Sequence, residues 1–544
     1  MGAWKILVIG LPLLVLAACG GGGGSTGGSG PILIGGPQVI TLTATAGDSQ
    51  ISFSHNTISG ATGFTLYYST SPGVTVATGT SLAMPTSPMV LPGLTNGTTY
   101  YAIATYTDLA GESAPSAQAS ATPAAPAASI YDPTWAAVAP TTTINHAYNG
   151  AQSATQNGTA LKAAMQALTA GQKLSIDTGS YELGSNFTLN LQGTAGAPIW
   201  ICAAGGATPV IYMNTSGQNI LNVGVGSQSR YLCFQGLTFT GGSLGVRFYD
   251  CTQIWFDQCK IHDTAEASLS TSTADTSYIY ITRNELWNTG GTGEGMYLGA
   301  NNGTVKMSNS IVALNHVHDT SGPTVTQGDG IELKQGSWGN LVAENLVHDC
   351  PYPCILVYGT AGMPRNTVER NVCYNSGDNV MQVQGECNVR NNLCINGAGS
   401  AFASQPHQGN PTEMTVVHNT FINGSGRATK LSSWNGAANM LFSNNASYSN
   451  SSFALEVVGG VSGIGFAGNV LKGTVTAGVS AGTYVAGTGL SDFVNLAWDA
   501  TARDAHLSAA SACRDVASAA NATSADLEGT SRAAPHDAGA YEGT

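Results

Sequence analysis

The sequence predicts an all-β chain whose larger part is a parallel β-helix, preceded by a small β-sandwich. Three observations lead to this prediction. One short motif recurs every 21 to 31 residues in the second half of the chain, which is the length of one solenoid coil. Residues 37–123 alternate apolar and polar side chains in short runs broken by Gly, Pro and Asn, the pattern of a sandwich. Seventy glycines and 9% charged residues in a chain of 544 favour an elongated array over several ordinary domains.

The charge balance limits the partners. The net charge is −13, and no Lys/Arg-rich run occurs. Binding to phosphates requires a basic surface, so we expect no nucleic-acid partner. An acidic ligand requires a few local cations or a bound metal ion. We expect a monomer.

Residues 1–18 predict a secretory signal. One Lys precedes an apolar run from Ile6 to Ala18, which is too short to span a membrane. The segment "LAAC" resembles the bacterial lipobox, which implies cleavage before Cys19 and acylation of its thiol. The protein would then be an exported bacterial lipoprotein at the outer membrane or cell surface, held by an N-terminal lipid anchor. The alternative is a plain signal peptide with a chance Cys. Residues 19–36 are a Gly/Ser-rich tether.

Ten cysteines follow Cys19, and an even number in an exported protein suits disulfides. Cys373 and Cys394 occupy equivalent places in neighbouring repeats, so a disulfide between them is geometrically plausible. Cys350 and Cys354 of "CPYPC" could close a small loop, although Cys350 could pair elsewhere. No C-x-x-C pair occurs, so a zinc site of the usual spacing is not expected.

Residues 37–123 carry "ISGATGFTLYYSTSPG", "LPGLTNGTTYYAIATYTDLAGESAPS" and "ASATP". These segments resemble a fibronectin type III domain, with Tyr100 at the family's tyrosine position. The resemblance implies a spacer or a weak binder. Residues 124–130, "AAPAASI", form a linker.

Residues 131–485 predict the β-helix. They include "NGTALKAAMQALTAGQKLSIDTGSYEL", an amphipathic helix leading into a strand. Together with "GTAGAPIWICAAGGATPVI", this segment resembles the N-terminal cap and first coils of right-handed parallel β-helix polysaccharide lyases, which have the pectate-lyase-like fold. Aligning the repeats predicts one amide per coil, in a structural ladder of stacked side chains, at Gln258, Asn284, Asn315, Asn345, Asn371, Asn392, Asn419, Asn445 and Asn469. Residues 486–544 resemble the C-terminal segment of many secreted β-helix proteins, which implies a cap over the open strand edges of the last coil.

A second strand in each coil predicts the candidate site. In "EGMYLGA", "DGIELKQG", "CILVYGT" and "NVMQVQG", the apolar positions point inward because side chains alternate along a strand; they are Met296, Leu298, Ile331, Leu333, Ile355, Val357, Met381 and Val383. The outward column then holds Tyr297, Glu332, Lys334, Leu356, Tyr358, Gln382 and Gln384. Glu294 and Asp329 lie just before their strands. Acids, a lysine, stacking phenols and amides between long loops predict a saccharide groove, with Tyr297, Tyr358, Gln382 and Gln384 as substrate-binding residues.

The segment "GDGIELKQGSWGNLVAEN" resembles part of the chondroitinase B and alginate lyase family, although its acids and lysine are spaced differently. The resemblance implies Lys334 as the catalytic base, Arg365 as the family's arginine, and Glu294, Asp329 and Glu332 as candidate Ca²⁺ ligands. The expected activity is β-elimination from an acidic, uronic-acid-containing polysaccharide. An unpaired Glu332 would hold the proton on Lys334, so the lysine acts as a base only if Glu332 is occupied, for instance by Ca²⁺. Two alternatives remain: a glycoside hydrolase using Glu294 and Glu332, and a non-catalytic adhesin or polysaccharide-binding protein.

Overall fold

The computed structural model describes residues 38–47, 50–85, 87–124 and 129–543. The chain divides into two units, residues 1–127 and 128–544, and this boundary lies in the predicted linker. The predicted signal, Cys19 and the tether lie outside the described residues. Within the described ranges, no helix is both long and apolar enough to cross a bilayer.

The first unit contains two antiparallel sheets. Its described strands are β1 (Leu42–Gly47), β2 (Gln50–His55), β3 (Gly63–Ser69), β4 (Thr80–Ala83), β5 (Met89–Pro92), β6 (Tyr100–Asp108), β7 (Gly111–Glu112) and β8 (Ala119–Ala121). One sheet has the order β1-β2-β5, and the other has β4-β3-β6-β7 with β8 paired to β6. The Tyr100 hydroxyl accepts a hydrogen bond from the Thr95 backbone N–H at 3.1 Å, the contact of a tyrosine corner in sandwich domains.

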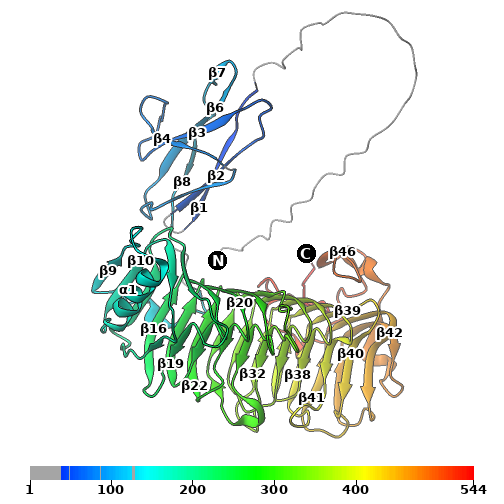
Figure 1. Cartoon of the computed structure of the whole chain (residues 1–544). Coiled ribbons are helices and arrows are strands. Elements are labelled where there is room, and N and C mark those ends of the chain that lie inside the picture. Colours follow the sequence, from blue (N-terminus) through cyan, green and yellow to red (C-terminus); the bar gives the residue numbers. More distant parts are fainter. Residues whose placement is uncertain (1–37, 48–49, 86, 125–128, 544) are drawn as a thin grey trace, which may run out of the picture. The chain divides into compact units, whose positions relative to one another are not determined.

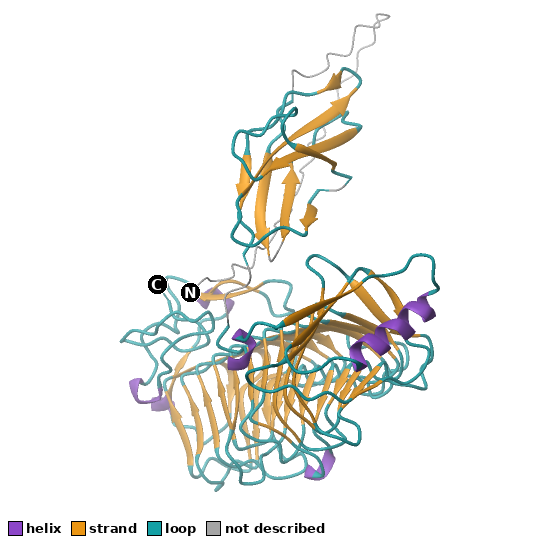
Figure 2. Cartoon of the chain, turned by 90° about the vertical axis from the view of Figure 1, so that its left-hand side faces the viewer, coloured by secondary structure: helices purple, strands orange, loops and turns teal. Residues whose placement is uncertain are grey.

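The second unit is a solenoid of parallel strands (Figures 1 and 2). Between residues 129 and 543, one 14-stranded sheet forms the column that we call the first sheet. Its strands are β9 (Thr142–His146), β10 (Gln172–Ile176), β13 (Ile199–Ala203), β16 (Ser229–Gln235), β19 (Cys251–Asp257), β22 (Thr276–Thr282), β25 (Met307–Ser308), β26 (Ile311–Ala313), β29 (Leu341–Ala343), β32 (Asn366–Glu369), β35 (Cys387–Arg390), β38 (Met414–Val417), β41 (Met440–Ser443) and β43 (Ile464–Ala467).

A second sheet holds two further columns. The A column consists of β11 (Gly179–Glu182), β14 (Pro209–Met213), β17 (Thr238–Gly241), β20 (Lys260–Thr264), β23 (Glu285–Thr289), β27 (His316–His318), β30 (Leu346–Cys350), β33 (Val372–Ser376), β36 (Leu393–Gly397), β39 (Thr420–Asn423), β42 (Ala446–Val458), β44 (Asn469–Val475) and β45 (Tyr484–Ala486). The B column consists of β12 (Thr188–Leu189), β15 (Leu221–Val223), β18 (Val246–Phe248), β21 (Leu269–Ser270), β24 (Met296–Leu298), β28 (Ile331–Leu333), β31 (Ile355–Val357), β34 (Met381–Val383), β37 (Ser400–Ser404) and β40 (Arg427–Ser432).

The predicted helix is α1 (Ala154–Gln166), which starts at a capping box between Ser153 and Gln156. Gly158 of α1 allows a close approach to β11, because a Cβ there would lie 1.9 Å from the Glu182 carbonyl oxygen. The short 3₁₀ turns in the described part are η1 (Thr134–Ala137), η2 (Asn301–Gly303), η3 (Ala481–Thr483), η4 (Leu490–Asp492) and η5 (Ala519–Asn521).

The inside of the coils is one continuous apolar core. All the residues predicted to point inward from the B column are fully buried and belong to the same cluster: Met296, Leu298, Ile331, Leu333, Ile355, Val357, Met381 and Val383. The predicted facing of the B column is therefore confirmed.

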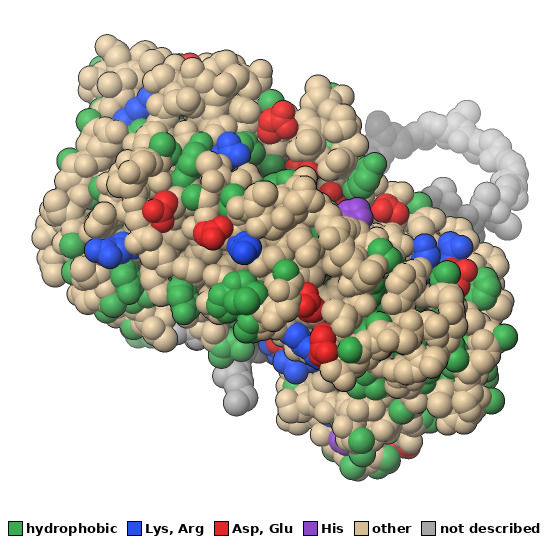
Figure 3. All heavy atoms as spheres, turned by 90° about the horizontal axis from the view of Figure 1, so that it is seen from below, with side chains coloured by type: hydrophobic (Ala, Val, Ile, Leu, Met, Phe, Trp, Pro, Cys, Tyr) green, Lys and Arg blue, Asp and Glu red, His purple; other side chains and the backbone are tan. Residues whose placement is uncertain are grey.

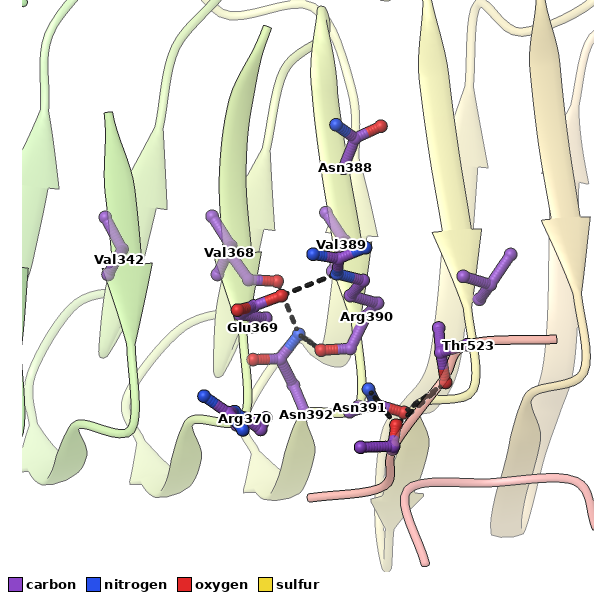
Figure 4. Close-up of polar contacts among 12 residues, drawn as sticks. Val342, Val368, Glu369, Arg370, Asn388, Val389, Arg390, Asn391, Asn392 and Thr523 are labelled. Atoms are coloured by element: carbon purple, nitrogen blue, oxygen red, sulfur yellow. Dashed lines mark hydrogen bonds and ion pairs between the residues drawn. The ribbon is translucent and has the colours of Figure 1, made fainter. Parts of the chain in front are cut away.

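Buried asparagines form a ladder at the turn before the A column. Asn345 accepts hydrogen bonds at Oδ1 from the backbone N–H and Nδ2 of Asn315, at 3.0 and 2.9 Å, and donates in the same way to Asn371. Its Nδ2 also donates to the Val312 carbonyl at 2.9 Å. Figure 4 shows the equivalent contacts of Asn392 with the carbonyls of Val368 and Arg390. The ladder runs from Asn284 to Asn469, as predicted.

The first predicted rung is wrong by one residue. The Cys259 backbone N–H, rather than Gln258, donates to Asn284 Oδ1, at 2.9 Å. Gln258 instead has a φ of 51°, as residues preceding the ladder asparagines do, such as Arg283 at 55° and Glu344 at 52°. In this turn, the residue directly before the ladder position adopts a left-handed backbone conformation. That conformation costs a non-glycine residue of order 1 kcal/mol of folding free energy. The ladder amides offset that cost.

The predicted disulfides are absent. Among the described residues, Cys350, Cys354, Cys373, Cys394 and the other cysteines are free, buried thiols. Cys373 and Cys394 are Cα partners in neighbouring parallel strands, and their side chains pack in the core cluster as small hydrophobic groups. Burial raises the pKa of Cys373 and Cys354 well above the usual range, so both thiols stay protonated and unreactive.

The C-terminal segment folds back along the side of the coils. Its strands β46 (Phe493–Leu496) and β47 (Arg503–Leu507) pair with each other, and Phe493 and Tyr541 pack with Ile395 and Ile422 of the A column in one cluster. Figure 4 shows Thr523 beside Asn391, to which it donates at 3.3 Å. We expected a cap over the last coil; these contacts instead cover the side of the A column, because Leu393, Ile395 and Ile422 make that side apolar.

The ladder should be a main source of solenoid stability. Replacing Asn345 with Ala leaves the Asn315 N–H and the Val312 carbonyl without buried partners, and each such loss costs about 1–3 kcal/mol. We expect Asn345→Ala to lower the free energy of unfolding by about 3 kcal/mol or more. Urea unfolding followed by tryptophan fluorescence measures this, since residues 37–127 contain no Trp. Asn450→Ala, at an exposed position, is the control and should stay within about 0.5 kcal/mol of wild type; equal effects would contradict the ladder's role.

A buried histidine should make the solenoid sensitive to acid. His418 is fully buried beside Asn444, and burial, with the charges of Arg532 and His536, lowers its pKa to about 2. The unfolded chain takes up this proton below about pH 6.5 while the folded chain does not. Stability should therefore fall as pH drops from about 6.5 toward 2, by up to ~1.4 kcal/mol per pH unit. Urea unfolding at neutral and mildly acidic pH should show this slope reduced in His418→Gln; an unchanged slope would refute the assignment.

Candidate active site

The outward side chains of the B column stack as predicted. Tyr297 of β24, Glu332 of β28, Leu356 of β31 and Gln382 of β34 are Cα partners in successive strands. The column is much less open than the predicted groove, however. Side chains expected at a wet surface are only 2–5% exposed: Glu332, Lys334, Leu356, Tyr358, Gln382 and Gln384.

Three carboxylates converge at the start of this column. One oxygen each of Glu294, Asp329 and Glu332 lie within 4.8 Å of one another, and all three residues are buried. Glycines bring the acids together: a Cβ on Gly295 would lie 2.6 Å from the Gly330 carbonyl oxygen. The repeated acid-glycine pair in "EGMYL" and "DGIEL" therefore stacks one acid on the other in neighbouring coils.

Lys334 is held against this acid cluster. Its ammonium forms an ion pair with Oε1 of Glu332, and the Tyr358 hydroxyl donates to the same oxygen at 3.1 Å. The Lys334 nitrogen also lies 4.2 Å from the ring centre of Tyr297 and 5.3 Å from that of Tyr358, within the range of cation–π attraction. The Lys334 ammonium thus lies beside a cluster of three carboxyl groups.

Three buried acids share one lysine, and this arrangement raises the pKa of two of the acids. Burial raises the pKa of Asp329 well above its usual range, and the charges of Glu332 and Glu294 add to the shift. Burial also raises the pKa of Glu332, against the opposing effect of Lys334. Among the described residues, three buried oxygens of the cluster have no hydrogen-bond partner: Glu294 Oε1, Asp329 Oδ1 and Glu332 Oε2. Such a set of hard oxygen donors suits a cation such as Ca²⁺.

Arg365 does not join this group. It directly precedes β32 of the first sheet, where it forms an ion pair with Glu413 and donates to Thr415 Oγ1 at 3.1 Å. The loop after Tyr358 ends before Arg365, so the arginine enters another face of the coil. The B column has a different arginine, Arg247 of β18, whose Cα partner Ser270 is in turn the partner of Tyr297.

The sequence prediction also missed a loop that covers the site. Residues 405–411, "QPHQGNP", connect β37 to β38. The ring centre of His407 lies 4.9 Å from that of Tyr358, and Gln405 Nε2 donates to Gln382 Oε1 at 3.0 Å. Gln408 reaches η2, accepting from the Asn302 backbone N–H at 2.8 Å and donating to Asn301 Oδ1 at 2.9 Å. The length of this connection and its Pro and Gly residues are the sequence features that indicate a long loop here.

The surface elsewhere is sparsely charged. Figure 3 shows a face on which acidic and basic side chains are scattered among uncharged ones. Against this background, four charged side chains buried within one column stand out, because buried charges require partners or a function.

If the acid cluster binds Ca²⁺, the ion raises the Tm of the solenoid, and Asp329→Asn removes most of that rise. It should also stabilise the Ca²⁺-free protein at neutral pH: a carboxyl group whose pKa is raised on folding costs stability once the pH exceeds its unfolded pKa. Thermal unfolding with and without Ca²⁺ tests both effects. Asp275→Asn, an exposed acid of the same unit, is the control; a Tm shift retained by Asp329→Asn would exclude this site.

Comparison with known proteins adds information about the fold. A family profile described as "Right handed beta helix region" matches residues 208–373 and 326–447. No curated protein sequence matches the chain. Among solved structures, the chain is similar to a pectate lyase, with 16% identity over 75% of this chain and 98% of that one and a TM-score of 0.43.

Two other lyase structures are similar at the same low level. An alginate lyase from Paenibacillus sp. str. FPU-7 is 19% identical over 51% of this chain and 99% of its own, with a TM-score of 0.34. A mannuronic acid specific lyase from human gut microbiota is 10% identical over 63% of this chain and 90% of its own, with a TM-score of 0.36. The profile match and the stacked parallel columns together identify the second unit as a right-handed parallel β-helix.

Proposed function

We propose that this protein cleaves an acidic, uronic-acid-containing polysaccharide by β-elimination, with Lys334 as the base. The observation that carries the proposal is the buried Lys334–Glu332 pair inside a cluster of three acids. A lysine that lies between two tyrosine rings and contacts a carboxylate is a group whose proton can be moved by a change at that carboxylate.

Two basic side chains in the outward register of the B column support an acidic substrate. Arg247 lies two strands before Tyr297, and Lys430 lies two strands beyond Gln382 in the same register. Successive strands are about 4.8 Å apart, so the two cations bracket a row of roughly 30–35 Å. A polyuronate laid along the column would meet a cation on each side of the reacting sugar.

In the proposed reaction, the Lys334 amine takes the proton from C5 of the uronic acid. The electron pair of that C–H bond forms the C4–C5 double bond, and the bond from C4 to the leaving oxygen breaks. The leaving oxygen takes a proton, for which the Tyr297 phenol is placed beside Lys334. Burial raises the pKa of Tyr297, so this phenol carries its proton at neutral pH. The products are an unsaturated sugar and a free hydroxyl, and no water is consumed.

The acid cluster fits a divalent cation, which Glu294, Asp329 and Glu332 would hold. Such a cation, when bound, neutralises a substrate carboxylate and makes the neighbouring C–H bond more acidic. Its charge would also weaken the hold of Glu332 on the Lys334 proton. The Tyr358 hydroxyl would keep Glu332 oriented through the bond seen here.

Substrate access requires the 405–411 loop to move. His407 and Gln405 lie against Tyr358 and Gln382, both residues that the sequence predicts to contact sugar. The loop is held at its tip by the side chain of Gln408 on exposed η2, so opening breaks few contacts. Closure over a bound sugar would exclude water from Lys334.

The hydrolase alternative rests on Glu294 and Glu332. Retaining glycosidases hold their two carboxyl groups about 5–5.5 Å apart, and oxygens of this pair lie within 4.8 Å. The pair serves less well because Asp329 adds a third acid between the same coils and Lys334 occupies Glu332. The other alternative, a silent polysaccharide-binding protein, predicts no product at all.

We further propose that the first unit is a fibronectin type III spacer, supported by its two antiparallel sheets and by the Tyr100 to Thr95 contact. Export and anchoring through an acylated Cys19 would place the β-helix at the outer membrane or cell surface, with residues 19–36 as the tether.

Removing the base tests the proposal. Lys334→Ala should lower kcat on the polyuronate that wild type cleaves by ~10²–10⁴-fold, the usual contribution of a general base, while the protein stays folded. The assay is the absorbance of the unsaturated product. Lys472→Ala, at an exposed lysine of the same unit, is the control. Full activity in Lys334→Ala would refute the lyase mechanism. Release of reducing ends without an unsaturated product would also refute it. If Glu294→Gln then loses this release of reducing ends, the protein is a hydrolase.

A further inference from the structure

A row of rings runs along the outside of the A column, away from the acid cluster. His262, Trp287, His318, His348 and Tyr374 are Cα partners in successive strands. Their rings stack, with centre distances of 4.2 Å between His262 and Trp287 and 5.3 Å between His318 and His348. His316 lies beside this row, with its ring centre 4.2 Å from that of His318.

Neighbouring aspartates fix the protons of two of these imidazoles. Asp319 lies 2.7 Å from Nδ1 of His318, and Asp349 lies 2.6 Å from Nδ1 of His348. A carboxylate only accepts hydrogen bonds, so Nδ1 carries the proton in both rings. Each Nε2 therefore carries a lone pair in the neutral ring. Nε2 of His318 is buried and has no hydrogen-bond partner among the described residues.

A hydrogen bond also fixes which nitrogen of His316 carries the proton. Its Nε2 lies 2.8 Å from Nε2 of His348, which can only accept. His316 must therefore donate through Nε2, and its Nδ1 has the lone pair.

These lone pairs face one carboxylate oxygen. Glu285 Oε1 lies 3.9 Å from His316 Nδ1 and 3.7 Å from His318 Nε2. The other oxygen of Glu285 is paired with Lys260 at 2.8 Å, which orients the carboxylate. Two imidazole lone pairs and one carboxylate oxygen thus meet within 4.8 Å, with acceptor facing acceptor and no proton between them.

We propose that Glu285, His316 and His318 form a binding site for a borderline transition-metal ion of the Zn²⁺ class. Zn²⁺ binds nitrogen at about 2.0–2.1 Å, so tetrahedral ligands lie about 3.3 Å apart. The two distances to Glu285 Oε1, 3.9 and 3.7 Å, would therefore shorten by about 0.4–0.6 Å on binding. Asp319 acts as the carboxylate that orients the ligand His318. His316 is oriented instead by His348, which Asp349 holds in turn.

The chemistry separates this site from the acid cluster. Imidazole nitrogens favour Zn²⁺, Ni²⁺ and Cu²⁺, whereas an all-carboxylate set favours Ca²⁺. The side chains of His316 and Glu285 are 37% and 34% exposed, so a metal ion can enter from solvent and keep an open position. The ligands come from two neighbouring strands, β23 and β27, so the ion would link two coils.

The test uses the full mature chain without a histidine tag, titrated with Zn²⁺ in excess Ca²⁺ against a chromophoric chelator. We expect one Zn²⁺ per chain in wild type and loss of at least ten-fold in affinity in His316→Gln and in His318→Gln. His262→Gln is the matched control, because His262 has the same aspartate arrangement with Asp263 but does not belong to the group of Glu285, His316 and His318. Co²⁺ bound in place of Zn²⁺ should show absorption bands of tetrahedral nitrogen and oxygen coordination that His318→Gln removes.

No Zn²⁺ binding by wild type, or binding that both ligand variants keep, would overturn the proposal. A loss in His262→Gln equal to that in His318→Gln would also overturn it, since it would point to the whole ring row. Circular dichroism of each variant shows whether a loss reflects unfolding.

Discussion

The stacking of parallel strands in strict register is the constraint on which the rest of this structure depends. Each coil places its residues directly over their equivalents in the previous coil, about 4.8 Å away. The buried asparagine ladder helps to fix that register, because each side-chain amide bonds to the backbone of the previous coil and to the asparagine side chain of the next. A slip of one residue would exchange the inner and outer faces of a strand.

Because the strands stack in register, repeated sequence motifs bring their side chains together. Residues about 30 positions apart become neighbours, so a motif that carries one acid per coil stacks acid on acid. Glu294 is stacked on Asp329 in this way, beside Glu332 of the same coil as Asp329, and burial with the charges of Glu332 and Glu294 raises the pKa of Asp329. The A column follows the same rule with imidazoles: "HVHD" and "LVHD" in successive coils place His318 over His348. In both columns the stacking gathers more electron-pair donors than cations, and that excess favours metal binding.

The sequence alone predicts what periodicity encodes. The repeat located the solenoid and all the ladder asparagines, and alternation correctly assigned the inner and outer faces of the B column. The first rung was placed at Gln258 instead of Cys259, because a thiol at that position breaks the amide pattern while its backbone keeps the bond. Periodicity does not encode the path of a loop or the packing of side chains from distant segments.

Three such features matter most. The resemblance predicts Arg365 in the site, but this residue lies at the first sheet beside Glu413. The point at which a loop rejoins the coil depends on the length and path of the loop, which the residue types do not reveal. The 405–411 loop was missed because Gln408 reaches Asn301 and Asn302, more than 100 positions away in sequence. The predicted disulfides failed because compatible spacing does not distinguish a bonded pair from two thiols packed side by side in an apolar core.

The central claim is that the buried lysine and acid cluster break a polyuronate without adding water. Mass spectrometry of the products formed in isotopically labelled water tests it most directly. Elimination breaks the bond from C4 to the leaving oxygen and transfers only protons, so we predict unsaturated products with no solvent oxygen at either new end. Incorporation of one labelled oxygen per cleaved bond would contradict the account and show that the column hydrolyses its substrate.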